Sequence, residues 1–462
     1  MPVRVCLAGL ALLLATATAL ADQGPKIEKY VLEAPKETNI AAPAALAKAF
    51  PEGFPQGLGS GVAYAGTAPD GATLLFVVGD RGPNADAPDF VAAPGAKPAP
   101  AKFFPAPDYA PTLATVRIKD GKASVTALKP LRDAAGKPLS GRPLPPGAVG
   151  STGETPLAAD RGVLPLDAAG LDTEGLVVSP TDGSLWLCDE YGPFLVNVDP
   201  ATGKVLRKFG PGQGLPDILA KRQPNRGFEG VAATTDGKVV AAVQSILDTD
   251  GKVKSSKAPF TRLVELDPAT GKTRMFAYPI DVDAYKKAAD AKIGDLVALS
   301  PTRLLIVEQG KGADKQMRNR VYAVDLSEAT DLTGKAAPDG APLESLADAA
   351  ALAQQGITMA RKSLVLDLRQ HGWTAEKAEG LAVSPDGKTL FLTSDNDFGL
   401  AVTPVNPAAG KDGKPVTDPT DYRMSPDGKL SLDGQEVATT FSIQPSGEKT
   451  TLWVVTLAEP LR

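Results

Sequence analysis

The chain has 462 residues and a formal net charge of −5, and it contains a single histidine and two cysteines. This mildly acidic balance argues against a nucleic-acid partner, which requires a basic face. The scarcity of histidine and cysteine argues against zinc and copper sites, which draw their ligands mainly from these residues. The 46 glycines and 42 prolines favour many turns and few long helices.

The first 21 residues have the pattern of a signal peptide. Arg4 precedes an apolar segment at residues 7–20, and Ala19-Leu20-Ala21 forms a cleavage site, so the mature chain is expected to begin near Asp22. The apolar segment is too short to span a bilayer comfortably, and no second one follows. We therefore expect a periplasmic or secreted protein without a membrane span, in which residues 22–462 form one domain.

Five stretches of the mature chain share one pattern: a small or acidic opening, a short apolar strand, a turn, a second apolar strand and a polar end. They begin, in chain order, at Gly59, Glu174, Glu229, Asp295 and Glu379. Four of the turns carry Asp-Gly, a strong hairpin signal between apolar segments, at Asp70, Asp182, Asp236 and Asp386. In most repeats two further strand-like segments follow, so each repeat is predicted to be a four-stranded meander.

A series of such meanders predicts an all-β fold, a single β-propeller with five blades. The last blade lacks a fourth strand after the segment that starts at Thr451, and the segment at residues 26–34 is expected to supply it. This closure hides both open edges of the ring. Six blades remain an alternative, because the segment at residues 439–443 is unassigned, and a two-sheet β-sandwich is another.

Four insertions lie between the strands, at residues 84–112, 136–170, 329–360 and 404–437. The first two are rich in proline and alanine, the third contains a helix-like stretch at residues 344–355, and the fourth carries Asp-Gly and proline turns. We expect all four to be surface loops, a type of segment that often lines binding sites.

Acidic residues recur where the first strand of a repeat starts and the second strand ends. These two strands are antiparallel, so both places lie at one rim of the central channel. Carboxylates that converge there repel one another unless they are protonated or bound to a cation. The predicted metal ligands are Asp80, Glu174, Asp189, Glu229, Glu308, Glu379, Asp395 and Asp397. Because these ligands are oxygens, calcium is the expected metal; the alternative is that the acids cap turns.

These segments resemble the family described as esterase-like activity of phytase, also called the phytase-like domain. The matching pieces run in order over most of residues 55–400. They include VVGDRGPN at Val77, LDTEGLVV at Leu171, LCDEYGP at Leu187, NRGFEGVA at Asn225 and TSDND at Thr393. The resemblance implies an exported propeller with a phosphoester or ester hydrolase activity, and it fixes no substrate.

The leading hypothesis is metal-assisted hydrolysis of a small phosphoester by a monomeric enzyme. The residues expected to carry catalysis are Glu174, Asp189, Glu190 and Glu229. The residues expected to grip phosphate are Arg81, Arg226 and Lys311.

Three alternatives stay open. A serine esterase would have to use His371, the single histidine, and the chain has no Gly-x-Ser-x-Gly elbow. A lactonase propeller is the second alternative, although the motifs match that family less well. A non-enzymatic propeller is the third, and it would bind a ligand or a protein at the acidic rim and use calcium only as a brace.

Overall fold

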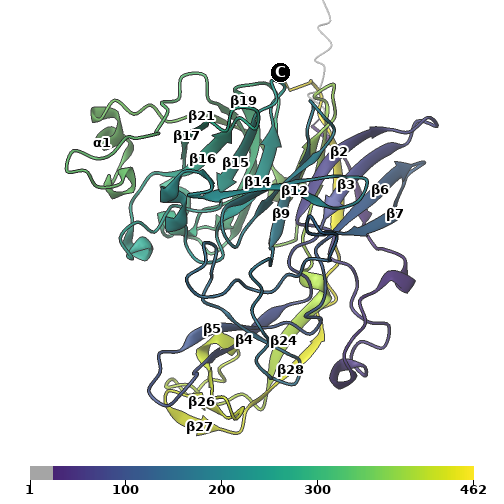
Figure 1. The fold of residues 1–462 in the computed structure, drawn as a ribbon, viewed down its shortest axis with the longest axis vertical. Helices are drawn as coiled ribbons and strands as arrows, with labels where there is room; N and C mark the ends of the chain where they lie inside the picture. Colours follow the sequence, from purple (N-terminus) through teal and green to yellow (C-terminus); the bar gives the residue numbers. More distant parts are fainter. Residues whose placement is uncertain (1–23, 462) are drawn as a thin grey trace, which may run out of the picture.

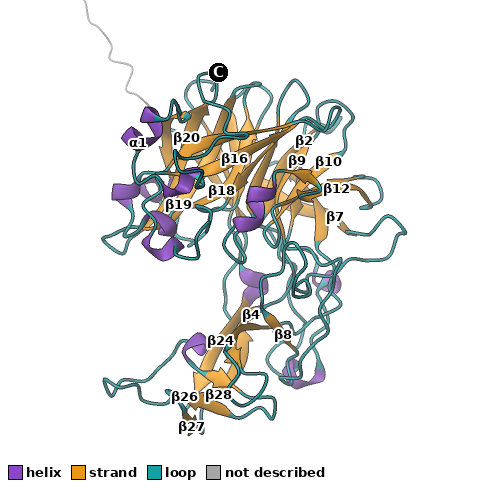
Figure 2. Ribbon diagram, turned by 60° about the vertical axis from the view of Figure 1, so that its left-hand side comes forward, coloured by secondary structure: helices purple, strands orange, loops and turns teal. Residues whose placement is uncertain are grey.

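The computed structural model describes residues 24–461, so the predicted signal peptide at residues 1–21 lies outside the described part. Five antiparallel sheets surround a common axis, which confirms the predicted five-bladed propeller (Figures 1 and 2). The first strand of each blade is innermost, and neighbouring innermost strands contact one another around the ring. Within residues 24–461, no helix is both long and apolar enough to cross a membrane.

The first four blades follow one another along the chain. Blade 1 consists of β2 (Gly61–Thr67), β3 (Thr73–Val78), β6 (Thr112–Lys119) and β7 (Lys122–Pro130). Blade 2 consists of β9 (Thr173–Val178), β10 (Leu185–Asp189), β11 (Phe194–Val198) and β12 (Val205–Pro211), extended by the short β13 (Gly214–Leu215). Blade 3 consists of β14 (Phe228–Ala233), β15 (Val239–Val243), β16 (Phe260–Leu266) and β17 (Thr273–Pro279). Blade 4 consists of β18 (Lys292–Ala298), β19 (Arg303–Lys311), β20 (Met317–Asp325) and β21 (Arg361–Asp367).

Blade 5 combines the two ends of the described chain. Its strands are β22 (Gly380–Val383), β23 (Thr389–Thr393), β29 (Thr451–Thr456) and β1 (Lys26–Val31). β1 pairs antiparallel with β29, from Lys26 opposite Thr456 to Val31 opposite Thr451. The predicted closure by the N-terminal strand is therefore confirmed. It covers the edge of β29 that would otherwise be left open for pairing with another chain.

The Asp-Gly turns form the hairpins that the sequence predicts. In blade 2, the Asp182 carboxylate accepts hydrogen bonds from the backbone N–H and the hydroxyl of Ser184. Gly183 follows with a φ of +71°, a left-handed conformation that glycine adopts without strain. The strands on either side are apolar, and all five residues of β10 are buried between neighbouring blades.

The five innermost strands approach one another closely at the axis because each carries a glycine there. A Cβ atom on Gly175 would lie 2.7 Å from both the Gly230 Cα atom and the Asp295 Oδ1 atom. In the other blades a serine or glutamate precedes this glycine. In blade 4 the glycine comes first, as Gly294-Asp295, so the Asp295 carboxylate lies at the axis. Asp295 accepts hydrogen bonds from the backbone N–H groups of Val231, Leu296 and Leu381, in blades 3, 4 and 5. This carboxylate therefore ties three blades together at the axis.

Three of the insertions expected to be loops contribute strands to a separate β-structure, the accessory lobe, below the propeller in Figure 1. One sheet has the order β27-β26-β25-β4-β5-β8, and a second pairs β24 with β28. The strands are β4 (Ala85–Phe90), β5 (Ala99–Phe103), β8 (Thr155–Leu157), β24 (Leu400–Val405), β25 (Arg423–Met424), β26 (Leu430–Leu432), β27 (Gln435–Val437) and β28 (Thr440–Pro445). The segment left unassigned by sequence is thus β28, and it does not start a sixth blade.

The loop expectation was wrong for residues 84–112, 404–437 and part of 136–170, because strands from these insertions pair across the sequence. β4 comes from the insertion in blade 1, and it pairs in parallel with β25 from the insertion in blade 5. An apolar core that includes Phe54, Phe103 and Met424 fixes the lobe. The lobe therefore joins the insertions of blades 1 and 5 with β8, which comes from the segment between blades 1 and 2.

The insertion at residues 329–360 contains less helix than the sequence suggested. Asp348 accepts a hydrogen bond from the Ala351 N–H and caps α1 (Ala349–Gln354), which spans only six residues. The insertion docks on blade 3 through a buried ion pair: Arg262 Nε and Nη2 donate to the two Glu344 oxygens at 2.6 and 2.9 Å.

Candidate metal centre

Glutamates from three blades converge at one end of the propeller axis, which we call the mouth. Glu174 lies in β9, Glu229 in β14, and Glu379 directly before β22. All three are buried, at 4–6 % exposure. A cavity of about 580 Å³ opens beside Glu229 and Glu379, and its wall also carries Lys292, Lys377 and other basic residues. The sequence had placed these carboxylates at one rim, and the structure brings them together there.

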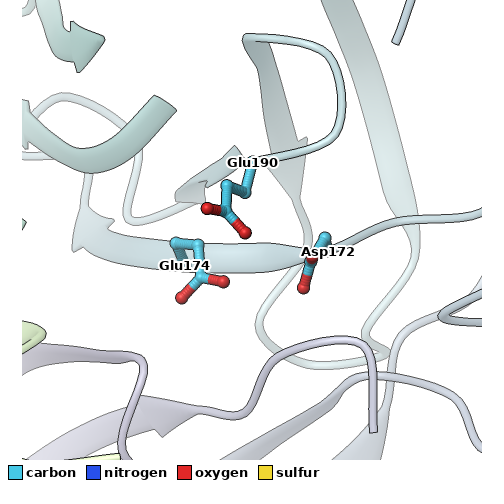
Figure 3. Close-up of side chains that lie close together, drawn as sticks. All are labelled: Asp172, Glu174 and Glu190. Atoms are coloured by element: carbon cyan, nitrogen blue, oxygen red, sulfur yellow. The ribbon is translucent and has the colours of Figure 1, made fainter. Parts of the chain in front are cut away.

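Asp172, Glu174 and Glu190 form the tightest acidic group at the mouth. Each offers a carboxylate oxygen, and the three oxygens lie within 4.8 Å of one another. Figure 3 shows Asp172 and Glu174 along the β9 segment, with Glu190 above them on the segment that follows β10. Sequence reasoning named Glu174 and Glu190 but missed Asp172. The sequence could have indicated Asp172, because it lies two residues before Glu174, and residues two apart on a strand point to the same face.

The three carboxylates differ in how many hydrogen bonds they already accept. Glu190 accepts one from Asn225 Nδ2 at 2.6 Å and one from Gln244 Nε2 at 3.0 Å. Asp172 accepts one from the Arg81 backbone N–H at 3.2 Å, and its second oxygen lies 3.4 Å from Arg81 Nε. No hydrogen bond to the Glu174 carboxylate is formed within residues 24–461. Free acceptor capacity therefore remains at the centre of the group.

Three more buried oxygens in this region have no hydrogen-bond partner among the residues that the structure describes. They are Ser60 Oγ, Glu229 Oε2 and Gln244 Oε1, in residues that are at most 4 % exposed. Buried polar atoms are nearly always paired in folded proteins, because an unpaired one costs about 1–3 kcal/mol. A cation, a proton or a buried water molecule can satisfy such unpaired oxygens beside a group of carboxylates.

Burial and mutual repulsion raise the pKa values of these acids. Burial, followed by the charge of Glu229, raises the pKa of both Glu174 and Glu190 well above its ordinary value. Burial and the neighbouring Glu379 raise the pKa of Glu229 to about 8. Burial, with a smaller contribution from Asp395, raises the pKa of Glu379 to about 8. Such shifts mean that deprotonating these acids requires a compensating positive charge.

Three of the predicted metal ligands surround a lysine that sequence reasoning did not select. Lys377 Nζ lies 3.5 Å from Glu379 Oε1, 3.2 Å from Asp395 Oδ2 and 3.4 Å from Asp397 Oδ1. The Lys377 ammonium lowers the pKa of Asp397. The predicted ligand set is thus divided into an open group around Glu174 and a second group that already holds a positive charge.

Asp189, predicted as both ligand and catalytic residue, serves the backbone instead. Its two oxygens accept hydrogen bonds from the N–H groups of Asp172 and Gly192, at 2.9 and 3.1 Å, and it is fully buried. The pairing of β10 with β9 shifts register between Leu187 and Asp189, and a one-residue shift changes which side chain faces a given side. The neighbouring Glu190 reaches the mouth in its place.

Glu308 lies apart from the acidic group, whereas Asp80 lies near it. Glu308 accepts hydrogen bonds from Tyr278 and Tyr285 hydroxyls and from Lys362 Nζ, at 2.8, 3.1 and 2.6 Å, so its oxygens are already used outside the acidic group. Asp80 stays near the mouth, where burial and the charges of Asp395 and Asp172 raise its pKa. One of its oxygens accepts the Gly82 N–H.

The basic residues predicted to grip phosphate have different surroundings. Arg81 is 6 % exposed, and its guanidinium group already contacts Glu154, Tyr191 and Asn225. Arg226 lines the cavity but donates to Ser245 Oγ and the Ala289 carbonyl. Lys311 lines the same cavity and is exposed.

Neither His371 nor Cys188 is placed for nucleophilic catalysis. His371 is exposed at the end of a short 3-10 helix (Leu368–His371), and within residues 24–461 it forms no hydrogen bond with a serine. Cys188 is fully buried, its sulfur accepts the Gly175 N–H, and burial raises the pKa of its thiol. The chemistry of the mouth is therefore that of carboxylates and lysines.

Comparison with known proteins gives a family match over most of the chain. A family model described as esterase-like activity of phytase matches residues 56–398. An uncharacterized secreted protein of Arthroderma benhamiae is 30 % identical over 123 residues, which is 21 % of this chain and 24 % of that protein. The chain thus matches about a quarter of the length of this curated relative.

Solved structures that resemble the chain do so weakly. Hydrazine synthase of Kuenenia stuttgartiensis has 12 % identity and a TM-score of 0.34, with 84 % of this chain and 96 % of that one covered. The periplasmic gluconolactonase of Pseudomonas aeruginosa has 12 % identity and a TM-score of 0.32, with 91 % and 99 % covered. These likenesses are too low to support an argument about the site.

Proposed function

Because the chain belongs to the phytase-like family, described as esterase-like activity of phytase, we propose that it hydrolyses phosphoesters with a divalent cation held at the mouth. The observation that supports this most is the group of Asp172, Glu174 and Glu190, whose oxygens lie within 4.8 Å of one another. Unpaired buried oxygens of Glu229 and Gln244 beside this group add to the case.

The residues of this group fit a hard cation. Every available donor is a carboxylate, amide or hydroxyl oxygen, which calcium prefers, with magnesium and manganese as the next choices. A calcium ion takes about six to eight oxygen ligands, so the three carboxylates would leave room for water and substrate. Calcium is accordingly the cation that we propose.

The cation would neutralise the oxygens of a bound phosphate and lower the pKa of a water molecule that attacks phosphorus. Neighbouring side chains would hold the metal-binding carboxylates in position. Asn225 and Gln244 orient Glu190, and Arg81 holds Asp172 through its backbone N–H and guanidinium group. Glu229, whose pKa is about 8, is suited to accept or return a proton at its unpaired Oε2.

The cavity beside Glu229 and Glu379 suits a small anionic substrate. Its volume of about 580 Å³ is in the range of small-molecule sites. Its basic wall residues would attract a phosphoester towards the cation, and they are Arg226, Lys286, Lys292, Lys311, Lys315 and Lys377. We further propose that the protein is exported through cleavage of residues 1–21 and acts as a monomer.

The test starts from mature protein that a chelator has stripped of metal. Calcium is added back, and the release of phosphate from p-nitrophenyl phosphate and phytate is followed together with the melting temperature. We expect calcium to restore turnover and raise the melting temperature, and Glu174→Gln to lose both effects. Glu265→Gln is the matched control, because Glu265 is equally buried but pairs with Arg274 in blade 3.

Two results would change the assignment. If calcium raises the melting temperature but neither phosphoesters nor carboxyl esters are cleaved, the protein is a calcium-braced binding propeller. If calcium changes neither quantity in the wild type, the cation site itself is refuted.

A further inference from the structure

Blades 2 and 5 place residues of opposite charge at the same position of the repeat. Asp172 lies two residues before Glu174, and Lys377 lies two residues before Glu379. In both blades the glutamate is followed by the glycine that approaches the axis. The two blades therefore have equivalent residues at the mouth, and the equivalent position holds a carboxylate in blade 2 and an ammonium group in blade 5.

The Lys377 ammonium occupies the kind of environment that a bound cation would have. Its Nζ atom is 3.2–3.5 Å from three carboxylates, and those of Glu379 and Asp395 belong to side chains that are 5 % and 3 % exposed. Asp395 turns one oxygen to the backbone N–H groups of Asn396 and Asp397, which leaves the other for Lys377. These contacts fix the position of the positive charge.

The turn that places Asp397 beside Lys377 contains strained backbone. Asp397 and Phe398 have φ values of +46° and +53°, a left-handed conformation that non-glycine residues adopt reluctantly. The fully buried Phe398 ring holds the turn; it lies against Tyr109, and a Cβ atom on Gly57 would come within 2.6 Å of it.

Lys377 also remains open to a ligand. Its side chain is 40 % exposed, and it lines the cavity together with Glu229 and Glu379. An ammonium group has three N–H donors that can be shared between carboxylates and a bound anion. The cavity and the Asp172–Glu174–Glu190 group are electrostatic neighbours: the charge of Glu174 helps to raise the pKa of Lys377, and Glu229, which lines the cavity, raises the pKa of Glu174 and Glu190. A substrate that extends from the cavity towards this group would contact both Lys377 and a cation bound there.

We propose that the ammonium group of Lys377 takes the place of a second metal ion at the mouth. It binds an anionic oxygen of the same substrate that contacts the divalent ion. This inference rests on the proposed function, because it names a further substrate-binding residue of that site. The arrangement corresponds to a two-cation site in which one cation belongs to the chain.

The inference predicts how many calcium ions the protein binds. The wild type should bind one ion at the mouth. Lys377→Ala frees the carboxylates of Glu379, Asp395 and Asp397, so it should bind a second. Lys377→Met, which keeps the length of the side chain without its charge, provides an independent neutral variant, and Lys377→Arg should bind one ion like the wild type. Lys311→Ala is the matched control, because it removes a positive charge from the same cavity without freeing a carboxylate.

Isothermal titration calorimetry measures calcium first and then inorganic phosphate in the presence of calcium. At a calcium concentration that fills only the first site, we expect phosphate to bind about tenfold or more weakly to Lys377→Ala and Lys377→Met than to the wild type, since a charge-assisted hydrogen bond contributes about 1.5–3 kcal/mol. Calcium binding by the two neutral variants with unchanged stoichiometry, while the wild type still binds phosphate, would overturn the inference and leave the proposed function standing. Failure of the wild type to bind phosphate with calcium present would refute the proposed function, and the inference with it.

Discussion

The ion pair between Arg262 and Glu344 gives a stability prediction that is independent of catalysis. The two side chains are 1 % and 2 % exposed, and both oxygens of Glu344 accept hydrogen bonds from the guanidinium group. Glu344→Ala leaves a buried charge without a partner, which costs about 3–5 kcal/mol. The unfolding entropy is about 2.1 cal/mol/K per residue, so a chain of this size should lose about 3–5 °C in melting temperature.

Differential scanning calorimetry on the single and double variants tests this reasoning. Arg262→Met combined with Glu344→Leu removes both charges and keeps the volume apolar, so it should recover most of the lost stability. Asp325→Ala is the control, because it breaks the exposed pair with Arg361 and should cost at most about 1 kcal/mol. A Glu344→Ala protein that melts within 1 °C of the wild type, or a double variant no more stable than the single one, would refute the argument.

Three further predictions concern closure, the thiol and pH. Deleting residues 26–31 exposes the edge of β29, so we expect oligomers in size-exclusion chromatography; a stable monomer would contradict the closure. The Cys188 thiol should react with Ellman's reagent only after denaturant is added, and rapid reaction of the native protein would contradict its burial. In the metal-free folded protein the pKa values of Glu229 and Glu379 are raised to about 8, from an ordinary value of 4.5 in the unfolded chain. The stability that this difference contributes is fully present below pH about 4.5 and is lost as the pH rises through about 8. The melting temperature of the metal-free protein should therefore fall between pH 5 and 9, less steeply with calcium, and a rise over that interval would contradict the shifts.

The five blades could be predicted because their signals are local. The stretch that forms β9 and β10 alternates apolar residues around an Asp-Gly turn, and the same pattern recurs in the other blades. The closure by β1 could also be predicted, since a ring of meanders that lacks one strand requires a partner from elsewhere in the chain.

The accessory lobe could not be predicted in the same way. β25 spans only two residues and β26 only three, which is too short for a periodic signal. Their pairing depends on β4, more than 300 residues away in sequence. Contacts of this kind are formed only when the propeller brings the insertions of blades 1 and 5 side by side.

At the mouth, too, some residues could be predicted from the sequence and others could not. Sequence reasoning found the rim and most of its acids, but it selected both Asp189 and Glu190, and only the register of β10 on β9 decides that Glu190 faces the site. It passed over Asp172 and Lys377, although each stands two residues before a selected glutamate.

The sequence alone determined the repeat and the end of the axis at which acids gather, because each depends on strand alternation and on turns a few residues long. It indicated five blades and left six possible, until the structure placed β28 outside the ring. Only the tertiary structure decided which carboxylate oxygens remain free. Backbone N–H groups satisfy Asp189, the Tyr278 and Tyr285 hydroxyls with Lys362 satisfy Glu308, and the ammonium of Lys377 neutralises Glu379. Several of these partners come from distant parts of the chain, and a carboxylate can hold a cation only where no such partner has already taken its lone pairs.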